Sequence, residues 1–191
     1  MIFLIIREES NMNIAFDMDG VLYPWHDAVY TYLRVEREDE IPEFNLLWKD
    51  PYKYVRKERW DFIATIPLLY STILPKKEIL AMLKKLDVEN NTLYYVTSRD
   101  KDLERVTKKY LDDYSFPQSF NLMHTKDKER IIRNWEIDAI VEDQASNLEK
   151  FSGLCKTIGI EHPWNEEKRG YLESLGVLFI PSAEFVGEIL C

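Results

Sequence analysis

Two aspartates end an apolar run near the start of the chain. Asp17 and Asp19 lie in the stretch NIAFDMDGVLYPWHD, residues 13–27, and Gly20 follows them directly. Carboxylates at the end of a buried strand can attack an electrophile, transfer a proton or bind a hard cation such as Mg²⁺. Such a pair alone is weak evidence, because short acidic pairs also occur in loops and helix caps. Gly20 would let the chain turn sharply beneath a bound ligand.

Polar residues also end the later strands that the sequence predicts. The run TLYYV ends in Thr97 and Ser98, and the run IDAIV ends in Glu142 and Asp143. A lysine-bearing stretch, HTKDK at 124–128, follows another short apolar run. Ligands bind at the carboxyl ends of strands in an open parallel sheet, especially where strand order reverses. We therefore expect these carboxylates, hydroxyls and a cation to form one site.

In this order the residues resemble the haloacid dehalogenase superfamily of phosphotransferases. DMDGVLY (17–23) matches its first motif, VTSR (96–99) the second, Lys128 the third and IVEDQASN (140–147) the fourth. The match extends over residues 13 to about 163. The first motif is specific in this context, whereas the lysine motif is loose. The resemblance implies a Rossmann-like sheet, a Mg²⁺ cofactor and an aspartyl-phosphate intermediate.

Physical chemistry assigns a role to each of these residues in the cleavage of a phosphate ester. Asp17 is the expected nucleophile, and Asp19 would protonate the leaving group and then deprotonate the attacking water. Thr97, with Ser98 in support, would bind the phosphoryl oxygens, and Lys128 would balance the developing charge. An aspartate at the position of Asp19 favours ester chemistry, because a dehalogenase has no use for a general acid there.

The expected Mg²⁺ ligands are all oxygens. They are Asp17, the backbone carbonyl of Asp19, Asp143, and Glu142 in a direct or water-mediated role. A divalent cation would cancel the repulsion between an attacking carboxylate and an anionic phosphate. Glu142 departs from the aspartate that is usual in the deoxyribonucleotidase branch of the superfamily, which weakens that subgroup assignment more than it weakens the chemistry.

Two lysines compete for the third motif. Lys126 and Lys128 lie on different faces, and Lys128 is preferred because TKDK followed by ERII places it at the start of a helix. The 5'(3')-deoxyribonucleotidase branch has its lysine in that position. The alternative for either residue is a solvated surface lysine.

The sequence predicts an α/β fold with a Rossmann-like parallel sheet sandwiched by helices and a small helical cap inserted after the first strand. Short apolar runs alternate with amphipathic ones, which is typical of strands and crossover helices. After the first strand, NIAFD, strands are expected at 92–99, 119–125, 137–143 and 155–160, and helices at 75–86, 100–114, 127–135 and 145–153. Residues 1–23 and 75–191 would form the core and residues 24–74 the cap, with a loop at 36–44.

Aromatic residues are frequent in the expected cap, and the resemblance implies that this segment selects the substrate. Its rings could stack on a nucleobase or pack the cap's own core. Trp25 and His26 are the preferred pocket residues, although His26 could equally be exposed. Arg99 would either reach the substrate or neutralise acidic charge. Trp164 and Asn165 either border the pocket or form a tight structural loop.

Composition bears on the binding partners and the cellular location of the protein. The 191 residues include 46% hydrophobic residues and carry a formal charge of −9, which gives no general reason to bind nucleic acid or an anionic membrane. Two cysteines are too few for a disulfide framework of the kind that secreted proteins use, so we expect the protein in the cytoplasm. The six apolar residues at the start are too short for a membrane span, and Met12 is an alternative translation start.

The preferred function is a Mg²⁺-dependent phosphomonoesterase for a small phosphorylated metabolite, with a deoxynucleoside monophosphate as the favoured substrate. The alternatives are a phosphatase for another small ester or for the 3'-phosphate of a nucleic acid, and a catalytically silent binding domain. A homodimer stays open for the assembly.

Overall fold

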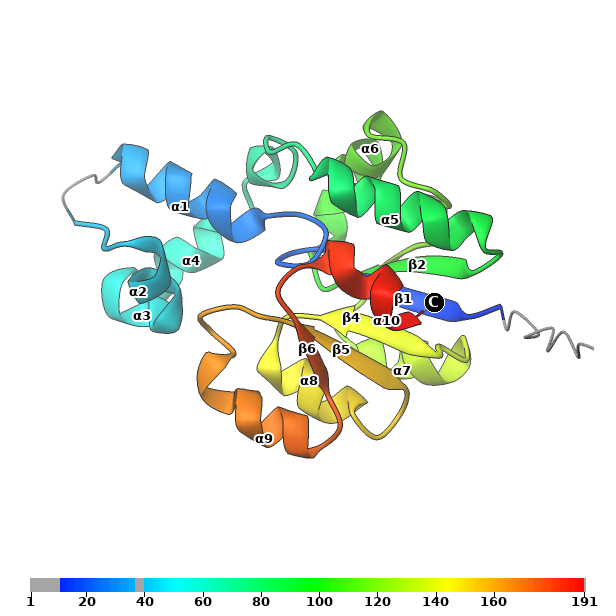
Figure 1. Ribbon diagram of the computed structural model, residues 1–191. Helices are drawn as coiled ribbons and strands as arrows, with labels where there is room; N and C mark the ends of the chain where they lie inside the picture. Colours follow the sequence, from blue (N-terminus) through cyan, green and yellow to red (C-terminus); the bar gives the residue numbers. More distant parts are fainter. Residues whose placement is uncertain (1–10, 37–39, 191) are drawn as a thin grey trace, which may run out of the picture.

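A single parallel sheet lies at the centre of the computed structural model, which describes residues 11–36 and 40–190 (Figure 1). In these residues six strands pair in the order β3-β2-β1-β4-β5-β6. They are β1 (Asn13–Asp17), β2 (Thr92–Thr97), β3 (Leu122–His124), β4 (Ala139–Glu142), β5 (Lys156–Ile160) and β6 (Leu178–Ile180). The expected α/β class and parallel sheet are confirmed. Strand order reverses between β1 and β4, where a doubly wound sheet places its ligand.

Side chains of the strands alternate between two layers of helices, as the two-residue period of a strand requires. Ile14 and Phe16 of β1 pack in one apolar cluster with side chains of α5 and α6, whereas Ala15 packs in another with α7 and α8. The first layer contains α5 (Lys77–Val88), α6 (Glu104–Asp113) and α10 (Val186–Leu190), and the second contains α7 (Lys128–Asn134), α8 (Ala145–Phe151) and α9 (Arg169–Ser174). Because both faces are covered, the strands are nearly continuous apolar runs.

Several predicted bounds differ from the observed ones. The expected strand 119–125 is reduced to β3, and β6, α9 and α10 were not predicted. The expected helix 100–114 begins with a 3₁₀ turn, at which the Asp100 carboxylate accepts a hydrogen bond from the amide of Asp102. The four short 3₁₀ turns of the described residues are η1 (Pro67–Tyr70), η2 (Lys101–Leu103), η3 (Glu166–Lys168) and η4 (Ala183–Phe185).

Helices rather than strands follow β1, as predicted. They are α1 (Trp25–Glu36), α2 (Phe44–Lys49), α3 (Pro51–Tyr54) and α4 (Lys57–Ile63), and they lie beyond the carboxyl ends of the strands (Figure 1). Their apolar residues form a separate cluster that includes Leu33, Leu47 and Ile63. Residues 37–39 of the predicted loop 36–44 lie outside the described residues, as do residues 1–10 of the segment before Met12. Among the described helices, none has both the length and the apolar composition of a membrane span.

Candidate active site at the carboxyl edge of the sheet

The turn after β1 places its first aspartate at the reversal point of the sheet. Asp17 is the last residue of β1, and the chain then folds back so that the amides of Leu22 and Tyr23 donate to the carbonyl of Met18 at 3.0 and 2.7 Å. Gly20 has a φ of +84°, and a Cβ atom there would lie 2.2 Å from Oδ2 of Asp143. Only glycine combines this backbone conformation with such a close approach, so it lets the turn pack against a second carboxylate.

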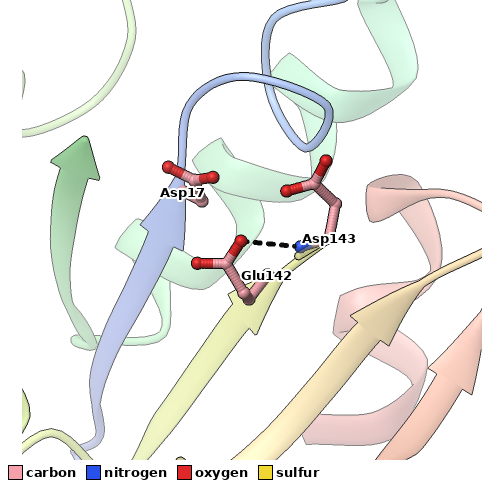
Figure 2. Close-up of side chains that lie close together, drawn as sticks. All are labelled: Asp17, Glu142 and Asp143. Carbon is pink, nitrogen blue, oxygen red and sulfur yellow. Dashed lines mark hydrogen bonds between the residues drawn. The ribbon is translucent and has the colours of Figure 1, made fainter. Parts of the chain in front are cut away.

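Three buried carboxylates meet at the ends of β1 and β4. Figure 2 shows Asp17, Glu142 and Asp143 gathered there, and one oxygen of each lies within 4.8 Å of one oxygen of the others. Nζ of Lys128 lies 2.7 Å from Oδ1 of Asp17 and 2.8 Å from Oε2 of Glu142. Three carboxylates and one ammonium leave two negative charges when all are ionised, which suits a divalent cation.

The partners of the carboxylates distinguish the members of this cluster. Oε1 of Glu142 accepts from the amides of Asp143 and Gln144, and Oε2 accepts from Lys128 and from Asn147 at 3.1 Å. Buried Oδ1 of Asp143, by contrast, has no hydrogen-bond partner among the described residues. A buried carboxylate oxygen without a hydrogen-bond partner is suited to bind a metal ion, since a buried charge otherwise needs a partner. The donor set therefore fits a cation bound through Asp17 and Asp143, with Glu142 engaged by protein donors.

Burial governs the protonation of the cluster. It raises the pKa of Asp17 to about 8, with help from the charge of Glu142 and against the pull of Lys128. It also raises the pKa of Asp143 well above the ordinary value, and Glu142 adds to that shift. Burial opposes the charge of Glu142 too, but Lys128 and the hydrogen bonds outweigh it and lower its pKa. The protein alone thus retains protons that a bound cation would displace.

Asp19 faces a buried arginine. Its Oδ1 and Oδ2 accept from Nη2 and Nε of Arg99 at 2.5 and 2.9 Å, and Nη1 of Arg99 donates to Oγ1 of Thr107 at 3.0 Å. The Arg99 guanidinium also lies 4.6 Å from the ring centroid of Tyr70. Arg99 therefore borders the cavity, and its guanidinium is engaged by Asp19 and Thr107.

A cavity of about 500 Å³ brings most of the predicted residues together. Its lining includes Asp17, Asp19, Trp25, His26, Thr97, Ser98, Arg99, Lys126, Lys128 and Asp143. Glu142 is not part of this lining and has no exposed surface. Thr97 is buried and its Oγ1 accepts from the Arg99 amide, whereas Ser98 is exposed. The two lysines differ, because Lys128 is buried within the cluster and Lys126 is exposed.

Several residues donate to the acidic cluster without having been assigned a role from the sequence, and Asn147, Trp164 and Asn165 are three of them. Asn147 donates to Glu142 and lies in the fourth motif, so its place in that motif was a usable signal. Trp164 and Asn165 were left open between the pocket and a structural loop, and both donate to Asp143. They belong to the loop after β5, where neither a strand nor a helix period indicates which way a side chain points.

Comparisons with known proteins agree with this architecture. A haloacid dehalogenase-like hydrolase from Streptococcus pneumoniae matches with a TM-score of 0.62 and 14% identity over 94% of this chain and 98% of that one. A protein from Haemophilus somnus described as a predicted phosphoglycolate phosphatase matches with a TM-score of 0.65 and 11% identity over 95% and 98%. The chain has the haloacid dehalogenase-like fold.

A sequence relative adds one further likeness. A protein of Clostridium acetobutylicum named a nucleotidase is 24% identical over 170 residues, which cover 83% of this chain and 84% of that protein. No family model matches the chain. The haloacid dehalogenase-like fold, together with a buried acidic cluster compatible with metal binding, is the result on which the functional proposal rests.

Proposed function

We propose that this chain is a Mg²⁺-dependent phosphomonoesterase that forms an aspartyl-phosphate on Asp17. One observation carries the proposal: Asp17 ends β1 at the reversal point of the sheet, lines the cavity and lies 2.7 Å from Lys128. A carboxylate paired with a lysine at the floor of an accessible cavity can attack an anionic ester that the lysine helps to hold.

The phosphoryl group of the ester would be bound by Thr97, Ser98 and Lys128. Oγ1 of Thr97 already accepts from the Arg99 amide, which leaves its hydroxyl proton free to donate to a phosphoryl oxygen. Asp17, Asp143 and the backbone carbonyl of Asp19 would hold Mg²⁺, with Glu142 in an outer position. The cation would supply positive charge that favours the ionised form of Asp17 and shields the phosphate.

The proposed reaction has two steps. A carboxylate oxygen of Asp17 forms a bond to phosphorus while the bond from phosphorus to the ester oxygen breaks, and Asp19 gives that oxygen a proton. Asp19 then takes a proton from a water molecule, whose oxygen attacks phosphorus and releases Asp17 and inorganic phosphate. Both oxygens of Asp19 accept from Arg99, so the first transfer requires that Asp19 carry a proton and turn one oxygen from Arg99 to the ester oxygen.

Residues 24–74 would act as the substrate-selecting cap, and residues 1–23 and 75–191 as the catalytic core. Trp25 and Tyr70 from this cap line the cavity, where flat rings suit a base. We therefore place a deoxynucleoside monophosphate first among substrates, with support from the name of the Clostridium relative. A cytoplasmic location belongs to the same proposal.

A phosphatase for another small ester is the second candidate, favoured by the structural likeness to a predicted phosphoglycolate phosphatase. An assay of phosphate release, with Mg²⁺ or with EDTA, separates the two candidates. Its substrates are deoxynucleoside and ribonucleoside 5'- and 3'-monophosphates, sugar phosphates and a 3'-phosphorylated oligonucleotide. We expect metal-dependent turnover with a preference for deoxynucleotides. If the protein hydrolyses only esters other than nucleotides, the nucleotidase assignment is wrong. If it hydrolyses none of these substrates, a binding domain is favoured.

A further inference from the structure

The loop between β5 and η3 holds one member of the acidic cluster from two sides. Nε1 of Trp164 donates to Oδ2 of Asp143 at 3.1 Å. Nδ2 of Asn165 donates to the backbone carbonyl of Asp143 at 2.8 Å and to that of Ile160 at 2.7 Å. The backbone and the carboxylate of Asp143 are therefore both fixed by this loop.

The two carboxylate oxygens of Asp143 have different surroundings. Oδ2 lies between the indole of Trp164 and the backbone of Gly20, and Nε2 of Gln144 approaches it at 3.5 Å. Oδ1 is buried and has no hydrogen-bond partner in the part of the chain that the structure describes. A side chain held by one oxygen in this way keeps the other oxygen available for a cation.

The indole of Trp164 is itself held in place by two histidines. The His26 ring of α1 stacks on it with centroids 3.9 Å apart, and the His162 ring stacks on it at 4.1 Å. A nitrogen of His162, Nε2, lies 2.7 Å from the carbonyl oxygen of Gly20. Burial lowers the pKa of His26 to about 3, so the His26 ring stays uncharged near neutral pH. The rings and the turn after β1 thus fix where the indole N–H points.

We infer that Trp164 is a positioning residue for the metal site: its indole N–H holds Oδ2 of Asp143 so that Oδ1 stays available to the divalent cation. This inference rests on the metal site of the proposed function. Partners that orient a metal ligand typically contribute 10- to 100-fold to metal affinity. The N–H of the indole makes this hydrogen bond, so a substitution that keeps an aromatic ring and removes the N–H tests the contact directly.

The test compares two tryptophans of the same ring cluster. Trp164→Phe keeps an aromatic ring and removes the N–H. Trp48→Phe makes the same change 6.1 Å away, at an indole whose buried Nε1 has no hydrogen-bond partner among the described residues. Free Mn²⁺ is measured by electron paramagnetic resonance during titration of the full chain, and Mg²⁺ then displaces the bound ion. We expect Trp164→Phe to raise both dissociation constants about 10-fold or more and Trp48→Phe to change them less than about 2-fold.

The outcomes are separable. Equal metal affinity in the wild type and Trp164→Phe overturns the inference and leaves the proposed metal site standing. An equal loss of affinity in Trp164→Phe and Trp48→Phe has the same meaning. A wild-type chain that binds neither ion overturns the metal site and this inference together. Thermal unfolding without metal shows whether each variant folds. If Trp164→Phe fails that check, Trp164→Leu replaces it with the same expected loss, because leucine also has no hydrogen-bond donor.

Discussion

At the carboxyl edge of the sheet a buried lysine is paired with two buried carboxylates, whereas α1–α4 bury mainly apolar and aromatic side chains. At the edge, Lys128 lies between Asp17 and Glu142 in a cluster that is almost fully buried. In the helical segment, the ring centroid of Trp48 lies 5.3 Å from that of Trp60 and 6.0 Å from that of Trp25. Charge pairs of that segment such as Lys57–Asp61 are largely exposed.

This difference determines how each region should respond to change. A buried charge that loses its partner costs about 3–5 kcal/mol, so the edge allows few substitutions. An exposed pair contributes about 1 kcal/mol or less, and one aromatic ring can replace another at small cost when volume is nearly kept. We therefore expect the chemistry to depend on the edge and the choice of substrate to depend on the helical segment.

The strongest break of this comparison is Asp17→Asn. An amide cannot form the acyl-phosphate, so we expect turnover to fall by at least about 10⁴-fold. The fold should persist, because asparagine has nearly the same shape and removes a carboxylate that is costly to ionise in this buried position. Initial rates and near-ultraviolet circular dichroism measure both effects. A variant that keeps more than a hundredth of the wild-type rate would contradict the covalent mechanism.

The next test sets the two lysines against each other. Lys128→Met leaves Asp17 and Glu142 without their shared cation, so we expect a loss of about 3–5 kcal/mol in unfolding free energy and of about 10²- to 10³-fold in rate. Lys126→Met changes an exposed residue and should cost less than about 1 kcal/mol. Denaturant unfolding and steady-state kinetics on both variants measure these effects. The reverse ranking would make Lys126 the motif lysine.

The sequence predicted the edge well because topology determines it. Once the order of strands and helices is known, Asp17, Thr97 and Asp143 must come together at the carboxyl ends. The placement of Lys128 also followed from position, since the start of α7 brings this lysine into the cluster.

Contacts made by irregular segments could not be predicted in the same way. Trp164 follows β5 in a loop, and its contact with Asp143 is accompanied by stacking on His26 from a helix distant in the sequence. Strand β6 (Leu178–Ile180) was not predicted either. The pairing of Asp19 with Arg99 joins residues 80 positions apart, and nothing local selected it from the two roles left open.

Protonation offers a smaller effect with a definite sign. The pKa of Asp17 is raised to about 8 in the folded protein, chiefly by burial, and that of Asp143 is raised too. The folded chain therefore binds more protons than the unfolded chain above pH 7, and its stability should fall as pH rises from 7 to 8.5. Burial lowers the pKa values of His26 and His162, so these two rings stay neutral in the folded protein over this pH range. In EDTA we expect a loss of about 1 kcal/mol from Asp17.

Thermal or denaturant unfolding at the two pH values measures this loss. Asp17→Asn is the matched control, since it removes that contribution and leaves the one from Asp143. Added Mg²⁺ should stabilise the wild type more at pH 8.5 than at pH 7, because fewer protons must be displaced. Metal-free protein that is equally stable or more stable at pH 8.5 would show that the buried carboxylates are not holding protons.

The helical segment gives the smallest expected effect. Trp25 lines the cavity and stacks on Tyr70 with centroids 6.0 Å apart, whereas Trp60 lies in the apolar cluster and does not line the cavity. Trp25→Phe reduces the surface on which a base could stack, so we expect KM for a deoxynucleotide to rise about 3- to 10-fold. KM for a small sugar phosphate should change less than about 2-fold, and Trp60→Phe should leave both values nearly unchanged. If the two variants instead alter both substrates equally, these rings serve packing alone, and selectivity must come from polar groups such as Asp61 and Thr65 that also face the cavity.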